Sequence, residues 1–148
     1  MTLQKLNPKQ KESMEFTNVE LTEERKTVDF GMDAVVCPLF ISGIRGGRSL
    51  DLTGFTGTEL RAGHVIVKDT QKGVYKPMPV TGSAYGTLPE NHEYVGILYK
   101  SIPVAAPMAS IMTNGEVNSK AAPYPMTTIL EAFKAACPNI TFVEAEDE

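Results

Sequence analysis

The 148-residue sequence contains no tryptophan, two cysteines and two histidines. Its longest apolar runs fall well short of the roughly 20 residues that a membrane-spanning helix needs, so we expect no membrane partner. Residues 1–16, MTLQKLNPKQKESMEF, have neither the apolar core nor the cleavage site of a secretory signal. We therefore expect synthesis in the cytoplasm.

The distribution of charge argues against a nucleic-acid partner. The chain has 14 basic and 18 acidic residues, and four of the acids lie in the last five positions, residues 144–148. Acids and bases balance in the rest of the chain, and no basic patch is present of the kind that phosphate contacts require. We expect no nucleic acid to bind.

The cysteines and histidines do not predict a metal site. Cys37 and Cys137 are each followed by proline, and their spacing from His64 and His92 matches no zinc-binding pattern. In the absence of a secretory signal, two buried thiols that pack as small apolar groups explain the cysteines best. We expect no metal and no cofactor.

No pattern in the chain is typical of a catalytic site. Glu90, His92 and Glu93 fit a solvated turn better than a general base, and no serine or cysteine occupies a nucleophile elbow. The glycine-rich residues 43–57 lack the lysine and the spacing of a phosphate-binding loop. The AGHV stretch at residues 62–65 has valine where deoxyuridine-triphosphate hydrolases have a catalytic aspartate. We expect the protein not to be an enzyme.

Composition divides the chain into three parts. Residues 1–27 contain five basic and five acidic residues but few apolar ones, which predicts an arm or a surface strand rather than a separately folded unit. Residues 28–143 have the composition and the short apolar segments of a single β-rich domain. Residues 144–148 form an acidic tail.

Short apolar segments bounded by glycine and proline predict the strands of this domain. A turn is expected at residues 71–73 and a loop at residues 81–91. Asn114-Gly115 predicts a type I′ β-hairpin, because both central positions of that turn need positive φ. The first predicted strand is residues 33–41, which we expect to be buried, with Pro38 marking a bulge or an edge. The other predicted strands are residues 64–68, 94–99, 109–113, 116–118 and 140–143.

One helix is predicted near the C-terminus. Thr128 and Glu131 fit a capping box, apolar residues then recur at helical spacing, and Pro138 ends the pattern. The predicted fold class is therefore mainly β with one short C-terminal helix, and the α+β class is the fallback.

Four segments, taken in order, resemble the capsid decoration and head-fibre proteins of tailed bacteriophages. They cover roughly residues 60–120, and the CPLFISG stretch at residues 37–43 resembles head-fibre proteins more faintly. The chain exceeds the smallest decoration proteins in its first 50 or so residues and in its helix, and it lacks the repetitive stalk of a complete fibre. The four segments are LRAGHVI at residues 60–66, GVYKP at 73–77, YVGILY at 94–99 and the stretch from Ala109 to Asn118 that ends in NGEVN.

This resemblance implies a β-clip-like fold and a structural accessory protein of a phage or prophage head. Such a protein would decorate or cement the icosahedral capsid as a homotrimer, or form the base of a head fibre. Its partners would be the major capsid protein and further copies of itself. It would be made in the cytoplasm of the bacterial host and lie on the outer surface of the virion capsid.

Exposure alone suggests which residues make the capsid or trimer contacts, namely residues 1–27 and the loops at residues 81–89 and 114–125. The arm could add a strand to an open sheet edge of a shell protein. The alternative function is a surface-displayed carbohydrate-binding or adhesion module, in which tyrosines stack on sugars. The candidate contact residues are Lys5, Lys9, Lys11, Tyr85, Asn114, Gly115 and Tyr124.

Overall fold

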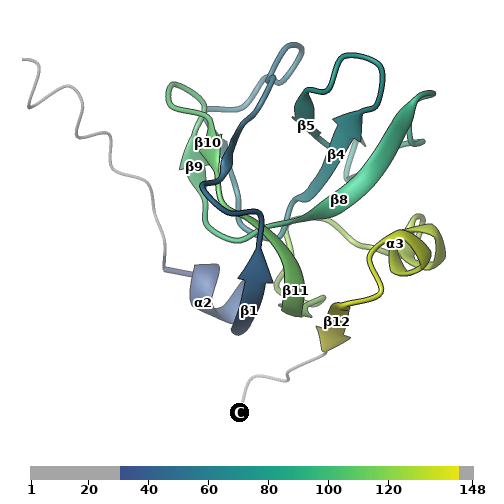
Figure 1. Cartoon of the computed structure of the whole chain (residues 1–148). Helices are drawn as coiled ribbons and strands as arrows, with labels where there is room; N and C mark the ends of the chain where they lie inside the picture. The colour runs from purple at the N-terminus through teal and green to yellow at the C-terminus, as the bar shows by residue number, and fades with distance from the viewer. Residues whose placement is uncertain (1–30, 144–148) are drawn as a thin grey trace, which may run out of the picture.

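The computed structural model describes residues 31–143 (Figure 1). The predicted arm, residues 1–27 with Lys5, Lys9 and Lys11, lies outside the described residues, and so does the acidic tail. The elements are α2 (Asp33–Val36), β1 (Leu39–Gly43), β2 (Arg48–Ser49), β3 (Glu59–Leu60), β4 (Val65–Asp69), β5 (Tyr75–Pro77), β6 (Val80–Thr81), β7 (Ala84–Tyr85), β8 (His92–Leu98), β9 (Ile102–Pro103), β10 (Met108–Ala109), β11 (Ile111–Asn118), α3 (Leu130–Ala136) and β12 (Ile140–Val143).

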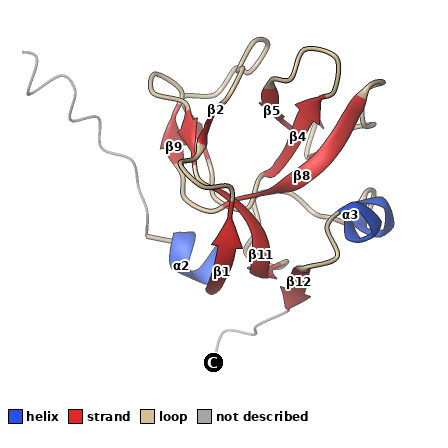
Figure 2. Cartoon of the chain, in the orientation of Figure 1, coloured by secondary structure: helices blue, strands red, loops and turns tan. Residues whose placement is uncertain are grey.

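The predicted mainly-β class is confirmed, and a six-stranded sheet organises the fold (Figure 2). Its strands follow the order β1-β11-β8-β4-β5, and β12 also pairs with β11. All of these pairings are antiparallel except that of β11 with β12, which is parallel. Three two-stranded pairings, β2 with β10, β3 with β9 and β6 with β7, complete the β structure.

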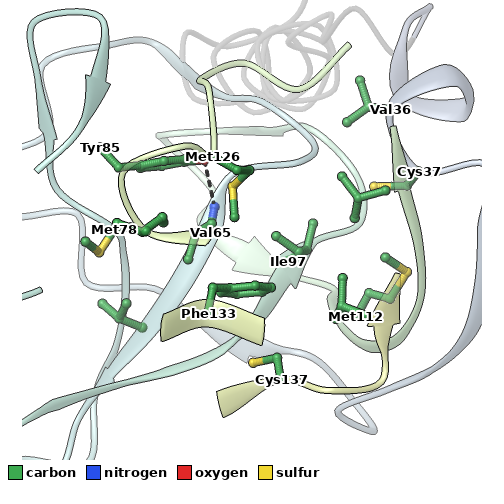
Figure 3. Packing of buried hydrophobic residues seen from close by; sticks show 14 residues of the cluster. Val36, Cys37, Val65, Met78, Tyr85, Ile97, Met112, Met126, Phe133 and Cys137 are labelled. Carbon is green, nitrogen blue, oxygen red and sulfur yellow. Dashed lines mark hydrogen bonds between the residues drawn. The ribbon is translucent and has the colours of Figure 1, made fainter. Parts of the chain in front are cut away.

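Apolar side chains cover both faces of the central strands. In β4, Val65 and Val67 join one cluster, here called the helix-side core, whereas Ile66 joins a second cluster around Leu50 and Leu60, the strand-side core. Phe133 of α3 is fully buried in the helix-side core, where Figure 3 shows its ring close to the central strands. Burial on both faces explains why β4 is a continuous apolar run rather than an alternating one.

Several sequence predictions are confirmed. Strands occur at Val65–Asp69, His92–Leu98 and Ile140–Val143, and a helix occurs at Leu130–Ala136, just before Pro138. The buried state predicted for Cys37 and Cys137 is also observed, and both thiols are free.

The prediction of one buried strand over residues 33–41 is wrong. The run divides into the short helix α2 and the edge strand β1, with Cys37 and Pro38 between them. Val36 and Cys37 are buried, but Leu39, Phe40 and Ile41 are exposed. Pro38 fits this position, because proline is tolerated where a strand begins at a sheet edge.

The predicted hairpin at Asn114-Gly115 is also wrong, since both residues lie inside the continuous strand β11. Among the described residues other than glycine, only Asn91 has positive φ, so Asn114 does not have the type I′ conformation. Gly115 is needed for a different reason. A Cβ atom there would collide with the Leu39 carbonyl oxygen of β1 and the Met112 sulfur.

Two further local details, the start of α3 and the loop at residues 81–91, also differ from the sequence prediction. Thr128 does not cap α3: the helix has Ile129 at its N-cap with no side-chain cap, and the Thr128 hydroxyl instead donates to the Tyr85 carbonyl at 3.4 Å. The loop expected at residues 81–91 contains the tight hairpin β6–β7, turned through Gly82 with φ of 67°. Positive φ at the first central position is typical of a type II′ turn.

Substitutions at 114 and 115 separate the strand from the hairpin. In the strand, Asn114→Val stays within about 0.5 kcal/mol of wild type, because β-branched residues suit a strand. Gly115→Ala costs about 1–3 kcal/mol, because the added methyl overpacks the contact with β1. Urea denaturation measures both. Equal destabilisation by the two variants would contradict the observed strand, since a type I′ turn requires both residues.

Candidate functional site

The exposed large apolar side chains of the described residues gather mostly in one stretch of chain. Met32 is 51% exposed, Ile41 58%, and Val35, Leu39 and Phe40 at least 40%. Met108, on β10, is the remaining one. We refer to Met32, Val35, Leu39, Phe40 and Ile41 as the β1 face. Large exposed apolar patches mark interaction sites in soluble proteins, which makes this stretch a candidate.

Position and composition both make the β1 face available for contact. Within residues 31–143, β1 pairs with β11 and with no other strand, so its second edge is open. Charged residues are one of the devices, beside proline, bulges and short length, that keep edge strands from further pairing. Residues 34–44 contain no charged side chain at all.

A hollow of about 410 Å³ lies beside α2, lined by Asp33, Ala34, Tyr99 and Lys100. The Asp33 carboxylate accepts hydrogen bonds from the Ser101 backbone N–H at 2.8 Å and from the Ser101 hydroxyl at 2.7 Å. The Phe40 ring lies 4.7 Å from the Tyr99 ring, centroid to centroid. The β1 face and the hollow are therefore neighbours, joined through Phe40 and Tyr99.

The two buried thiols are poor nucleophiles. Burial raises the pKa of Cys37 to about 12, with a further contribution from the negative charge of Asp33. Burial likewise raises the pKa of Cys137 to about 11. Because the thiolate is the reactive form, these raised pKa values fit thiols that pack as small apolar groups.

A second concave region, of about 530 Å³, lies between the loop after β2 and the segments around β5 and β6. Its wall mixes polar and aromatic groups. Asp51 at its rim accepts hydrogen bonds from the Thr53 hydroxyl at 2.6 Å and the Thr53 N–H at 3.1 Å, and these bonds lower the pKa of the carboxyl group. We call this region the cleft, and its lining includes Asp51, Phe55, His64, Lys76, His92 and Tyr124.

His64 lies at the base of the cleft in a fixed tautomer. Its Nε2–H donates to the Met78 carbonyl at 2.9 Å, and the rings of Tyr85 and Tyr124 pack edge-on at 5.4 and 5.6 Å. Burial lowers the pKa of His64 to about 4, so the ring is neutral near pH 7. The Tyr85 hydroxyl accepts a hydrogen bond from Val65 N–H at 3.1 Å, and burial raises its pKa. The cluster joins β4, β7 and the loop before α3.

His92 is the first residue of β8 and pairs with Asp69 of β4. Its Nδ1–H donates to the Glu90 carbonyl at 2.8 Å, and Glu90 and Glu93 are exposed. Residues 31–143 hold no group of three or more histidine, cysteine or acidic side chains arranged to bind a metal. No helix in that range is long and apolar enough to cross a membrane.

The predicted contact residues were chosen for their expected exposure, and the structure shows how exposed the described ones are. Tyr85 is only 3% exposed and Gly115 is buried, so exposure no longer supports either one as a contact. Asn114 and Tyr124 are half-buried. Sequence reasoning missed the β1 face, because an apolar run such as residues 34–41 has the composition of a core strand. Pro38, which the sequence marked as a bulge or an edge, was the one local signal of an edge strand.

Comparison with models of protein families and with curated proteins finds no match for this chain.

The buried His64 makes stability depend on pH. The unfolded chain binds a proton near the ordinary pKa of about 6.5, whereas the folded chain binds it near 4. Stability is therefore full above pH 6.5 and falls as the pH drops toward 4. From pH 7 to pH 4 we expect the free energy of unfolding to lose about 3 kcal/mol more in wild type than in His64→Gln. Urea denaturation at both pH values measures this, and parallel losses in the two proteins would contradict it.

Proposed function

We propose that this protein is a structural accessory protein of a phage or prophage head. It decorates or cements the icosahedral capsid as a homotrimer, or forms the base of a head fibre, and it performs no catalysis. Its partner is the major capsid protein, and its place is the outer surface of the virion.

The observation that carries the proposal is the arrangement of the four segments that resemble decoration proteins. They contribute to β4, β5, β8 and β11, which are consecutive neighbours in the sheet order β11-β8-β4-β5. The LRAGHVI segment supplies the turn into β4, where Gly63 has φ of 91° and its N–H donates to the Leu98 carbonyl of β8 at 2.8 Å. The four segments thus lie together in one sheet, as a single shared fold would require.

The surface of the molecule also suits a cementing role. A decoration protein needs exposed contact surfaces, and the β1 face with its open strand edge provides one. When several copies bind neighbouring shell subunits together, modest contacts add up to high avidity. Reactive groups are not required.

Light scattering followed by co-sedimentation tests the proposal. We expect the purified protein to have a mass of about 48 kDa, three chains of 16.1 kDa, and to pellet with the heads of the phage whose gene cluster encodes it. Pelleting should saturate at a stoichiometry that matches the shell symmetry. A protein that stays in the supernatant at saturating head concentrations would remove the proposed function.

A carbohydrate-binding or adhesion module is the second candidate, favoured by the aromatic and polar lining of the cleft. Phe55 and Tyr124 offer ring surface beside Asp51 and Lys76, a combination suited to sugars. Tyr85 is buried and does not present its ring to a ligand.

A glycan array separates the two candidates. We expect no glycan-specific signal from wild type, because the cleft side chains serve packing in a decoration protein. Phe55→Ala and, as a matched control outside the cleft, Met108→Ala complete the set. A wild-type signal that Phe55→Ala abolishes and Met108→Ala retains would favour the carbohydrate-binding module.

A further inference from the structure

The base of the cleft presents one hydrogen-bond acceptor. His64 lines the cleft and is only 2% exposed, and its Nε2–H donates to the Met78 carbonyl at 2.9 Å. The neutral ring therefore carries a lone pair on Nδ1, for which residues 31–143 supply no donor. Every fully enclosed side-chain nitrogen or oxygen in that range has a partner, so Nδ1 is not enclosed and opens onto the cleft.

The wall around this acceptor is apolar. Val67 and Met78 line the cleft and are at most 1% exposed, so they form its deepest part together with His64. A ligand rich in hydroxyl groups would leave several of them unpaired against such a wall, and each unpaired buried polar group costs free energy. The base of the cleft therefore suits an apolar body that ends in a single donor.

The rim of the cleft offers charged groups of both signs, Asp51 and Lys76. Both hydrogen bonds from Thr53 go to Oδ1 of Asp51, and Oδ2 accepts none from the described part of the chain. The Lys76 ammonium lies 4.0 Å from Oδ2 of Asp69, which is too far for a strong hydrogen bond. A carboxylate accepts from a peptide N–H and an ammonium donates to a peptide carbonyl, so this rim suits a polypeptide backbone.

We propose that the cleft binds a tyrosine side chain of a partner polypeptide. The ring lies against Val67 and Met78, the hydroxyl donates to Nδ1 of His64, and the flanking peptide groups bind Asp51 and Lys76. Tyrosine carries its donor at the far end of an apolar ring, whereas the N–H of tryptophan lies on the edge of the indole. The cleft, at about 530 Å³, exceeds a single ring and leaves space for flanking residues. This inference goes beyond the proposed function and depends on the cleft alone.

Two peptides that differ by one hydroxyl test the hydrogen bond, Ac-Gly-Gly-Tyr-Gly-Gly-NH2 and its phenylalanine counterpart. NMR titration of the full chain, followed on the backbone amides of Val67 and Met78, gives both dissociation constants. We expect the tyrosine peptide to bind roughly fivefold more tightly, because phenylalanine leaves Nδ1 of His64 unpaired. Equal affinity, tighter binding of the phenylalanine peptide, or no binding of either peptide at millimolar concentration would overturn the proposal.

The His64 ring provides a readout that needs no variant. The ¹⁵N resonance of Nδ1 should move when the tyrosine peptide is added and stay in place with the phenylalanine peptide, since only the first donates to the lone pair. In His64→Phe, which keeps a ring and removes the acceptor, the preference for the tyrosine peptide should disappear. A Nδ1 resonance that responds to neither peptide would overturn the proposal even if this variant does not fold.

A variant pair places the peptide in the cleft. Phe55→Ala removes a ring from the lining, and we expect it to weaken binding of the tyrosine peptide at least fivefold. Met108→Ala, a strongly exposed residue outside the cleft, is the matched control and should leave the affinity unchanged. Equal effects of the two variants would contradict binding in the cleft.

Two further ligands identify the source of the phenol. p-Cresol has the ring and the hydroxyl without the peptide groups, so we expect it to bind at least tenfold more weakly than the tyrosine peptide. Methyl α-glucoside should leave the amides of Val67 and Met78 unchanged, because the base of the cleft offers one acceptor and an apolar wall. p-Cresol that binds as tightly as the peptide, or a glucoside that shifts these amides, would overturn the polypeptide partner.

Discussion

The fold depends on close backbone contact along β11. This strand pairs with β1 on one side and with β8 and β12 on the other, so its neighbours must approach without intervening side chains. Glycine makes this approach possible. A Cβ atom at Gly96 of β8 would collide with the Met112 carbonyl of β11, and one at Gly115 would collide with the Leu39 carbonyl of β1. The two cores then pack on the faces that this pairing creates.

The exposed surface follows from the same arrangement. Because β8 and β12 occupy the other side of β11, β1 lies at the edge of the sheet. There it pairs with β11 alone among the described strands. Val36 and Cys37 lie at the core, and the side chains that follow them turn outward. A short stretch of chain therefore passes from core to surface without any change in its apolar character.

Features set by local sequence were predictable, and features set by distant partners were not. The β4 run and the helix before Pro138 follow from short-range patterns and appear in the structure. Asn114-Gly115 did not form its expected turn, because the flanking segments pair with other strands rather than with each other. Thr128 likewise bonds to Tyr85 rather than to its own helix. The β1 face was not predicted for the same reason. Residues 39–41 have the composition of a core strand, and their exposure depends on which other strands cover them.

The parallel pairing of β12 with β11 has a consequence for how the chain folds during synthesis. Leu39 of β1 pairs with Glu116, and Gly115 pairs with Ile140, so both edges of β11 are completed by segments distant in sequence. A topology of such high contact order folds slowly compared with one built from local hairpins. On the ribosome, β1 emerges long before its partner strand, and β11 emerges before β12. The sheet can therefore be completed only when nearly the whole domain has left the exit tunnel.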